Sequence, residues 1–242
     1  MIYSKSNLLE NRLEFITCYR DKRISEEGIE LFYGEPPFFK NAFVFDEKAI
    51  PQVPAHFEMH IPDWVRIGEA VLKKNNWQKK DAMKYVWLNG TTDQWATNPS
   101  IQIVKIKNKK DLPLFCKTQS MGFNEKPIEK DPWYAYICNS AGRNFGKGKS
   151  HFYVALLNDV PIGITLSFYH KNLAGIYSVT TIKEYRGMGA STSLMKKVVD
   201  DALKAEMKGI TLQTMIGSYA EGFYEKLGFE DSFSMHIYEQ QK

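Results

Sequence analysis

The stretch that decides the fold is Ser178-Val179-Thr180-Thr181-Ile182-Lys183-Glu184-Tyr185-Arg186-Gly187-Met188-Gly189-Ala190-Ser191. An extended segment leads into a loop that has glycines at positions 187 and 189. The stretch therefore predicts a strand, a tight loop and a helix N-terminus in succession. From Gly189 onward, apolar residues recur with helical spacing and fall on one stripe, at Leu194, Met195, Val198, Val199, Ala202 and Leu203.

The start of this predicted helix is suited to an anion. The first backbone N–H groups of a helix lack intrahelical partners and carry the positive end of the macrodipole. Glycines at 187 and 189 leave these amides uncovered, so a phosphate can approach them directly. The dinucleotide-binding pattern Gly-x-Gly-x-x-Gly is excluded, because no third glycine lies three residues on and no βαβ unit follows.

The loop resembles the acyl-CoA-binding motif of the GNAT superfamily of N-acetyltransferases, Gln/Arg-x-x-Gly-x-Gly/Ala, at Arg186, Gly189 and Ser191. Ser191 stands where the family has Gly or Ala. Since serine is small and favours helix starts, we expect it to be tolerated and to add a hydroxyl toward the phosphate. The resemblance implies a mixed α/β fold in which helices flank a central, mostly antiparallel twisted sheet.

The resemblance also implies which residues contact coenzyme A. In the family, the strand before the loop splays from its neighbour and offers main-chain groups to pantetheine. Val179 and Thr181 are expected to play this backbone role. The expected contacts of the phosphate loop are Arg186, Gly187, Met188, Gly189, Ala190 and Ser191. Acetyl-CoA is the expected co-substrate, and no metal is expected.

A second motif follows at the spacing that the family requires. Gly209 is placed as a helix C-cap, residues 210–215 alternate like a strand, and residues 219–227 predict a short helix that ends at Gly228-Phe229. This end resembles the family's Tyr-x-x-x-Gly-Phe signature. The resemblance implies that Tyr224 is the catalytic residue that donates a proton to the departing CoA thiolate, because a phenol and a thiolate have similar basicity.

The chain is expected to divide near residue 100. Polar residues 89–100 predict a linker between an N-terminal α/β region, 1–100, and a catalytic domain, 101–242. In the catalytic domain we expect a strand at 101–106, helices from 111 and near 134–137, a hairpin with a turn at Asn158-Asp159, and a strand at 173–181. In the N-terminal region we expect strands at 29–33, 42–45 and 85–88, and a helix opening at 62–64. This order resembles a degenerate copy of the catalytic fold without a phosphate loop.

Composition limits the range of partners. Of 242 residues, 43% are apolar and 25% are charged, and the net charge is +4. No run reaches five like charges, so we expect no nucleic-acid partner. Three widely spaced cysteines, the lack of a secretory segment and the lack of an apolar run of about 18 residues predict a cytoplasmic protein without a membrane partner. Monomer and homodimer both remain open.

Three other patterns are interpreted as structural. Residues 142–150 nearly spell a Walker A loop, but the first glycine lies one residue too far from Gly148-Lys149-Ser150 and a strand is expected to follow. His56 and His60 are four apart, but prolines nearby disfavour a helix, so they do not predict a metal site. Four tryptophans, at 64, 77, 87 and 95, are assigned to the core rather than to base stacking.

Two functions of different class fit these residues. The first is an acyl-CoA-dependent N-acyltransferase that transfers acetyl from acetyl-CoA to a primary amine of a small molecule or peptide. The second is a non-catalytic acyl-CoA-binding sensor or scaffold. Many family members carry a glutamate base on the strand before the loop, but residues 174–180 contain no carboxylate. The base stays open among Glu184, Glu221, Glu225, Asp231 and His170.

Overall fold

The computed structural model describes residues 4–34, 40–88, 90–124, 131 and 134–241. These residues form two compact units. The first unit comprises residues 7–12 and 88–212, and the second comprises residues 4–6, 13–87 and 213–242. Because 213–242 group with 13–87, the compact units divide the chain differently from the predicted domains 1–100 and 101–242. The domain boundary near residue 100 stays a prediction.

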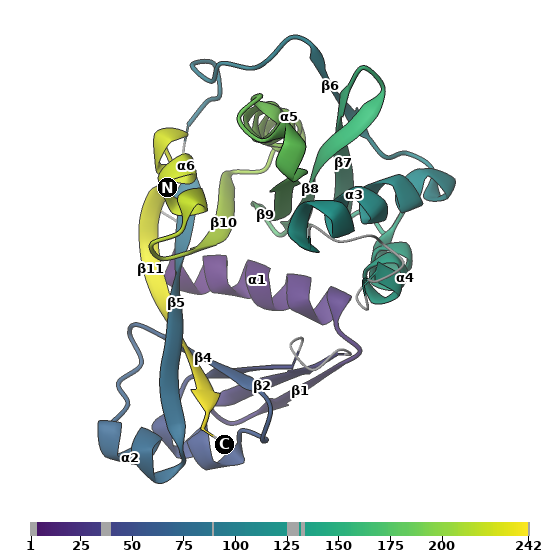
Figure 1. The fold of residues 1–242 in the computed structure, drawn as a ribbon. Helices are drawn as coiled ribbons and strands as arrows, with labels where there is room; N and C mark the ends of the chain where they lie inside the picture. The colour runs from purple at the N-terminus through teal and green to yellow at the C-terminus, as the bar shows by residue number, and fades with distance from the viewer. Residues whose placement is uncertain (1–3, 35–39, 89, 125–130, 132–133, 242) are drawn as a thin grey trace. The chain divides into compact units, whose positions relative to one another are not determined.

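The first unit is built on antiparallel strands that end in one parallel pair (Figure 1). Neighbouring strands from β6 to β9 pair antiparallel, and β9 pairs parallel with β10 through Leu173–Gly175 and Gly209–Thr211. The strands are β6 (Ile101–Lys105), β7 (Ser150–Leu157), β8 (Val160–His170), β9 (Leu173–Thr181) and β10 (Gly209–Met215). The helices are α3 (Leu112–Asn124), α4 (Tyr134–Asn144), α5 (Ala190–Lys204) and the 3-10 turns η3 (Lys109–Asp111) and η5 (Lys183–Tyr185).

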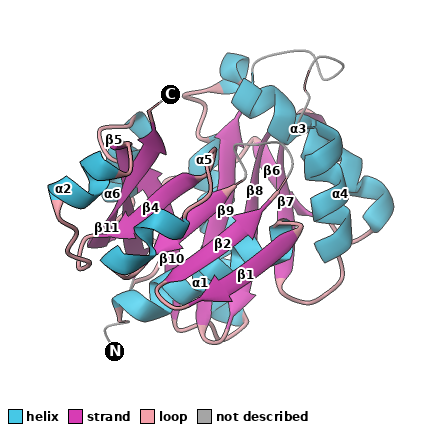
Figure 2. Ribbon diagram, turned by 90° about the horizontal axis from the view of Figure 1, so that it is seen from below, coloured by secondary structure: helices cyan, strands magenta, loops and turns pink. Residues whose placement is uncertain are grey.

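Two adjacent residues of β7 show how helices cover both faces of this sheet (Figure 2). Phe152 packs edge-on against Phe115 of α3, with ring centroids 5.1 Å apart. The next residue, Tyr153, donates a hydrogen bond of 3.1 Å to Asp201 of α5. Since successive side chains of a strand point to opposite faces, α3 and α5 lie on opposite sides of the sheet.

The second unit contains the strands β1-β2-β3-β4-β11-β5, which are neighbours in this order in the sheet and pair mostly antiparallel. Its single parallel pair among the described strands is β3 with β4. The strands are β1 (Lys22–Glu26), β2 (Ile29–Tyr33), β3 (Asn41–Val44), β4 (Glu58–Pro62), β5 (Trp77–Leu88) and β11 (Glu230–Gln240). The helices are η2 (Glu47–Gln52), α2 (Glu69–Lys74) and α6 (Tyr219–Lys226), and buried apolar residues such as Ile29, Val44, Met59 and Trp77 form the core.

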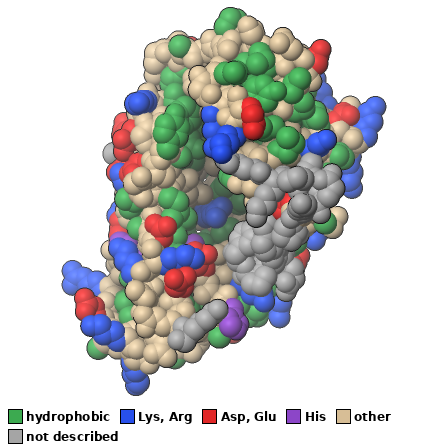
Figure 3. All heavy atoms as spheres, in the orientation of Figure 1, with side chains coloured by type: hydrophobic (Ala, Val, Ile, Leu, Met, Phe, Trp, Pro, Cys, Tyr) green, Lys and Arg blue, Asp and Glu red, His purple; other side chains and the backbone are tan. Residues whose placement is uncertain are grey.

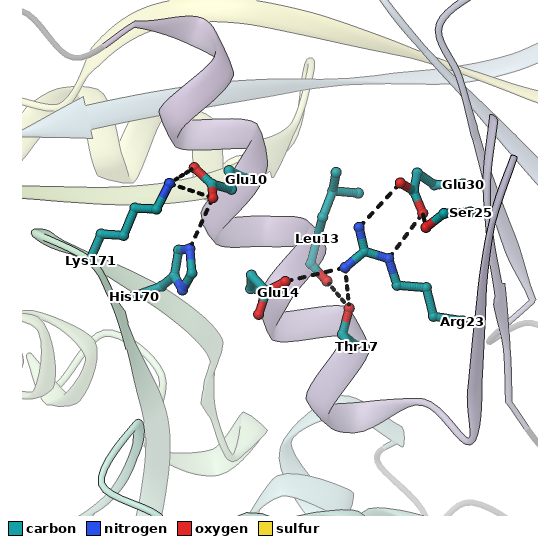
Figure 4. A network of polar contacts seen from close by, with 9 residues as sticks. All are labelled: Glu10, Leu13, Glu14, Thr17, Arg23, Ser25, Glu30, His170 and Lys171. Atoms are coloured by element: carbon teal, nitrogen blue, oxygen red, sulfur yellow. Dashed lines mark hydrogen bonds and ion pairs between the residues drawn. The ribbon is translucent and has the colours of Figure 1, made fainter. Parts of the chain in front are cut away.

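Helix α1 (Lys5–Tyr19) has polar contacts within each unit (Figure 4). In the first unit, Glu10 accepts from Lys171 at 2.7 Å and lies 3.3 Å from His170. In the second unit, Arg23 contacts Glu14 at 3.2 Å and Glu30 at 2.9 Å. Glu10 and Glu14 lie four residues apart on this helix, and each contacts residues of its own unit.

Buried Asn11 of α1 explains one glycine of β9. Its side-chain oxygen accepts from the Tyr177 hydroxyl at 2.8 Å, and its amide donates to the Leu173 carbonyl at 3.3 Å. A Cβ at Gly175 would lie 2.2 Å from the Asn11 oxygen. Only glycine therefore fits at position 175, since an added methylene in such a packed site forces a shift.

Most predicted elements are confirmed. The turn at Asn158-Asp159 has φ values of 50° and 63°, which are typical of a type I′ hairpin. The predicted stripe of α5 is buried except at Leu203, which is 41% exposed. The predicted strands of the N-terminal region are present as β2, β3 and the end of β5.

Three expectations are wrong in detail. Gly209 begins β10 and is no C-cap; α5 ends at Lys204, and Glu206 takes the left-handed conformation at φ 60°. Residues 62–68 form no helix, because Pro62 ends a strand paired with Met235 of β11, and α2 starts only at Glu69. Trp64 is 40% exposed and lies outside the core. The linker at 89–100 stays a prediction: Asn89 lies outside the described residues, and the side chains of Thr92 and Asn98 form hydrogen bonds with residues 196 and 188.

Surface and membrane properties are reported for the described residues alone. None of the described helices is long and apolar enough to cross a membrane. On the face shown in Figure 3, the described Lys and Arg side chains are scattered among acidic and uncharged ones rather than gathered in a stripe. That distribution gives no electrostatic footprint of the kind that follows a nucleic-acid backbone.

Candidate functional site

A β-bulge interrupts β9 just before the glycine loop. Ile164 pairs with Thr180 and Leu166 pairs with Tyr177, so Ser178 and Val179 together oppose the single residue Thr165. Ser178 has a left-handed φ of 55°. A bulge of this kind takes peptide groups out of the ladder and re-aims them. The bulge lies at Val179, whose main-chain contact with pantetheine stays a prediction.

The strand also loses its parallel partner along this stretch. Within the described residues, β9 pairs with β10 over Leu173–Gly175, and the pairing does not extend to Ile176–Thr181. Bulge and unpaired edge coincide at residues 178–181. The sequence predicted the strand, but no glycine or proline announced the bulge.

Glycines at 187 and 189 shape the loop between β9 and α5. Their φ values are 83° and 88°, a region that favours glycine over residues with a Cβ. A Cβ at Gly187 would meet nothing within 4 Å, so open space lies beside the main chain there. Gly189 is the N-cap of α5 and brings no side chain to the cap. The first amides of this helix lack intrahelical partners, and the site is a cradle that suits a phosphate group.

The remaining predicted loop residues take different positions. Ala190 is buried as the first residue of α5, and the Met188 side chain is 45% exposed. Ser191 Oγ lies 3.0 Å from Thr181 Oγ1, so the two hydroxyls form a hydrogen bond between the end of the strand and the start of the helix. The Ser191 hydroxyl therefore closes the base of the loop.

The Arg186 side chain holds the loop to its surroundings. Its Nε donates to the Thr181 carbonyl at 3.2 Å, and its Nη2 donates to the Gly122 carbonyl at 3.3 Å. Gly122 is in the last turn of α3, where helix carbonyls lack intrahelical donors. A Cβ at Gly122 would lie 2.6 Å from Thr180 Cγ2, so α3 packs directly on β9 there. Arg186 is thus a bridge from the loop to both elements.

The segment predicted as a linker supports this loop from the other side. Asn98 Nδ2 donates to the Met188 carbonyl at 2.9 Å, while its Oδ1 accepts from the Ser100 amide at 2.9 Å. Thr92, 1% exposed, bonds to Asp200 and accepts from Lys196 Nζ at 2.8 Å, both on α5. Sequence reasoning missed Asn98, because a contact across about 90 residues leaves no local signal.

Tyr224 lies on α6 in the second unit. Ser218 caps this helix by accepting from the Glu221 amide, and the chain turns at Gly228, φ 87°, into β11. The Tyr224 ring packs at 5.3 Å from Phe223 and 5.8 Å from Phe229. Burial of this side chain raises the pKa of Tyr224 to about 12. The phenol therefore keeps its proton at neutral pH.

Three of the open base candidates, Glu221, Asp231 and Glu225, form ion pairs with Lys84. Lys84 of β5 contacts Glu221 at 2.6 Å and Asp231 at 2.8 Å, and Glu225 is 3.8 Å away. The hydrogen bond from Lys84 lowers the pKa of Glu221, which disfavours this carboxylate as a base. His170 lies in the first unit beside Glu10.

The two alternative motifs do not form sites. Among residues 142–150, α4 ends at Asn144 and β7 begins at Ser150, so the helix that a Walker A loop requires does not follow. His60 is a strand residue stacked on Phe43, and His56 precedes the strand in a turn. Over the part of the chain that the structure describes, no group of three or more His, Cys, Asp or Glu side chains is placed to hold a metal.

The fold and the loop define the class of protein. A bulged strand that runs through a glycine loop into a helix N-terminus, within a mostly antiparallel sheet, is the arrangement of the acyl-CoA N-acyltransferase fold. Residues 113–229 match the model of the Acetyltransferase (GNAT) family. This segment of the chain belongs to the GNAT family, and the resemblance predicted from the two motifs is confirmed.

Solved structures of low sequence identity share the fold. A GCN5-related N-acetyltransferase from Kribbella flavida covers 100% of this chain and 97% of its own, with a TM-score of 0.70 and 9% identity. The match to a putative acetyltransferase of the GNAT family from Novosphingobium aromaticivorans covers 98% of this chain and 96% of that protein, with a TM-score of 0.60 and 16% sequence identity. The match to a tandem GNAT protein from the clavulanic acid biosynthesis pathway covers 87% of this chain and 77% of that protein, with a TM-score of 0.61 and 12% sequence identity. No curated protein matches the chain.

Proposed function

We propose that this protein transfers an acetyl group from acetyl-CoA to a primary amine of a small molecule or peptide. The observation that carries the proposal is the loop at 186–191, in which two left-handed glycines open the N-terminus of α5 beside the bulge of β9. Acetyl-CoA supplies an acyl group activated as a thioester. The family match over residues 113–229 supports acyl transfer in general, and the acetyl donor is the simplest choice within it.

In this proposal the loop holds the pyrophosphate and the bulged strand holds the pantetheine arm. Amides at Gly187, Met188, Gly189, Ala190 and Ser191 face the phosphates, and the open space beside Gly187, where a Cβ would meet nothing within 4 Å, leaves room for them. The guanidinium of Arg186 shapes the loop through its two carbonyl contacts. Val179 and Thr181 contribute main-chain groups at the unpaired edge.

Tyr224 is the proposed general acid. Its assignment rests on its place in the Tyr-x-x-x-Gly-Phe helix end, which the family match includes. Because burial raises its pKa to about 12, Tyr224 Oη carries a proton at neutral pH and can give it to the departing thiolate sulfur. The attacking amine must be neutral, so a base or a water chain must take its proton, and the identity of the base stays open.

The N-terminal region is proposed as a degenerate copy of the catalytic fold. It repeats the element order of the catalytic part: a helix, an antiparallel hairpin, a third strand, a crossover to a parallel strand, and a short helix before a long strand. In this copy the crossover is η2 and carries no glycine loop. The similarity of the fold to a tandem GNAT protein supports this proposal.

The test is a screen of primary amines, both small molecules and short peptides, with acetyl-CoA, following release of the CoA thiol. The proposal expects acceptor-dependent release by the parent protein and none by Gly189→Glu. If acetyl-CoA binds but no amine stimulates release, the non-catalytic sensor is the better description. If acetyl-CoA does not bind at all, the acetyltransferase and the non-catalytic acyl-CoA sensor are both excluded.

A further inference from the structure

Helix α6 carries Tyr224 but has little apolar packing of its own. It is eight residues long, and among these described residues Tyr224 alone is buried, at 7% exposure. A helix this short is marginal in water, and most helical stability in proteins comes from the packing of an apolar face. The direction of the Tyr224 phenol therefore depends on the polar contacts that hold α6 to the sheet.

Lys84 of β5 supplies such contacts. Its Nζ lies 2.6 Å from Glu221 and 3.8 Å from Glu225, which precede and follow Tyr224 on α6. The same Nζ lies 2.8 Å from Asp231, near the start of β11. All of these residues belong to the second unit. One ammonium group, which with its three carboxylates we call the Lys84 cluster, thus joins α6 to β5 and β11.

Within the Lys84 cluster, Glu221 has the most contacts with its surroundings. Its carboxylate also accepts from the Gly217 amide at 2.6 Å, next to the Ser218 cap of α6. The Lys84 and Glu221 side chains are 21% and 15% exposed, so water and salt screen this pair less than a pair on the open surface. Hydrogen bonds with Asp231 and Glu221 raise the pKa of Lys84, so the lysine keeps its charge at neutral pH.

We propose that Lys84 is the positioning residue of Tyr224: by holding α6 to β5 and β11, it fixes the direction of the phenol. The use of this phenol as an acid rests on the proposed acyl transfer, whereas the hold on Tyr224 does not require turnover. Without the ammonium, three carboxylates lie close together and repel one another. Helix α6 then shifts and carries Tyr224 with it, and a misplacement of about 1 Å can cost about 100-fold in rate.

The first measurement follows Tyr224 by nitration with tetranitromethane. Trypsin cleaves after Lys208 and Lys226 and so gives one peptide that contains both Tyr219 and Tyr224. Tyr219 is 92% exposed and serves as the internal reference. The reagent modifies the phenolate, and burial raises the pKa of Tyr224 to about 12, so Tyr224 should react slowly in the parent. In Lys84→Met, the nitration of Tyr224 relative to Tyr219 should rise at least about threefold, because α6 opens more often.

The second measurement uses the proposed reaction. In Lys84→Met, kcat should fall about tenfold while the KM for acetyl-CoA stays that of the parent, since the acid is misplaced and the phosphate loop is unchanged. In a Tyr224→Phe background, the same substitution should cause no further loss of kcat, because the group that Lys84 positions is already absent. A residue that only stabilised the fold would lower kcat in both backgrounds.

Two further variants complete the experiment. Lys80→Met is the matched control, because Lys80 lies on the same strand and forms its ion pair with Glu239 of β11 at 3.3 Å. Its nitration ratio and kcat should equal those of the parent. Glu221→Gln removes one partner of Lys84 and should raise the nitration ratio as Lys84→Met does, so it decides the question if Lys84→Met does not fold. Circular dichroism checks the folding of each variant.

Three results would overturn the proposal. The first is a parent-like nitration ratio in folded Lys84→Met, and the second is an equal rise of this ratio in Lys80→Met. The third is a loss of kcat that is as large in the Tyr224→Phe background as in the parent. A parent protein that releases no CoA thiol with any amine would contradict the acyl transfer alone, and the nitration ratio would still decide whether Lys84 holds Tyr224.

Discussion

Among the described strands, two crossovers join parallel neighbours, β3 to β4 and β9 to β10, and the helices in these crossovers begin with different N-cap residues. At the first, Asp46 caps η2, and its carboxylate accepts from the Lys48 amide at 2.9 Å. At the second, Gly189 caps α5 and offers no side chain. The first crossover therefore satisfies its helix start with its own carboxylate, whereas the second leaves that place to an external anion.

A second pair of segments shows the same contrast. After α6 the chain turns at Gly228, φ 87°, into Phe229, and after α2 it turns at Asn76, φ 58°, into Trp77. Phe229 and Trp77 are both buried, at 4% and 5% exposure. Counted back from these aromatics, Tyr224 corresponds to Leu72. The N-terminal segment keeps the packing of the helix end but lacks the phenol.

The largest expected effect concerns this phenol. Tyr224→Phe removes the proposed acid and keeps the ring that packs on Phe223 and Phe229, so kcat should fall about 10²- to 10⁴-fold with little change in acetyl-CoA affinity. Steady-state kinetics and calorimetry measure the two quantities. Tyr219→Phe is the matched control, because Tyr219 lies on the same helix and is 92% exposed.

The pH dependence sharpens this prediction. Burial raises the pKa of Tyr224 to about 12, so the phenol should stay protonated from about pH 6 to about pH 10. The loss caused by Tyr224→Phe should be constant over that range. A loss that disappears as the pH rises toward about 9 would mean that Tyr224 titrates there and is not the acid described above.

Substitution of Arg186 tests whether the loop at 186–191 depends on the hydrogen bonds of this side chain to the Thr181 and Gly122 carbonyls. Arg186→Ala removes donors to the Thr181 and Gly122 carbonyls, so the KM for acetyl-CoA should rise about tenfold, equivalent to about 1.4 kcal/mol. Arg186→Lys should restore little, because one ammonium cannot reproduce the fixed geometry of the guanidinium. Full rescue by lysine would indicate that charge, and not the bridge, matters.

Asn98 should have a smaller effect on the same loop. Asn98→Ala removes the donor to the Met188 carbonyl, a single hydrogen bond of about 1 kcal/mol, so the KM for acetyl-CoA should rise about fivefold while kcat is unchanged. Thr92→Val is the control, since Thr92 fastens the same segment to α5 without contacting the loop. If the KM for acetyl-CoA rises equally in both variants, Asn98 only stabilises the segment and has no specific effect on the loop.

Local sequence signals predicted the parts of the molecule that local physics determines. The Asn158-Asp159 pair can adopt the left-handed turn of a hairpin, and Gly187 and Gly189 marked the loop. The helix expected to open at 62–64 begins only at Glu69, because pairing of β4 with β11 takes Pro62 into a strand. Tertiary pairing overrides local propensity there.

Long-range features left weaker signals or none. The alternation of buried Phe233, Met235 and Ile237 predicts a strand, and this signal could have revealed β11. The bulge at Ser178 had no glycine to mark it, and its left-handed conformation depends on the neighbouring strand β8. The Asn98 contact with Met188 joins segments far apart in sequence, which a single sequence does not reveal.

The central claim is that the start of α5, and not the start of η2, holds coenzyme A. Titration calorimetry of acetyl-CoA into the parent, Gly189→Glu and Glu47→Gln proteins tests it directly. We predict one site per chain in the parent and in Glu47→Gln, and binding at least about 100-fold weaker in Gly189→Glu, where a negative charge is added at the N-terminus of α5 and a side chain must adopt φ 88°. Parent-like binding by a folded Gly189→Glu protein, or no uptake by the parent, would contradict the account.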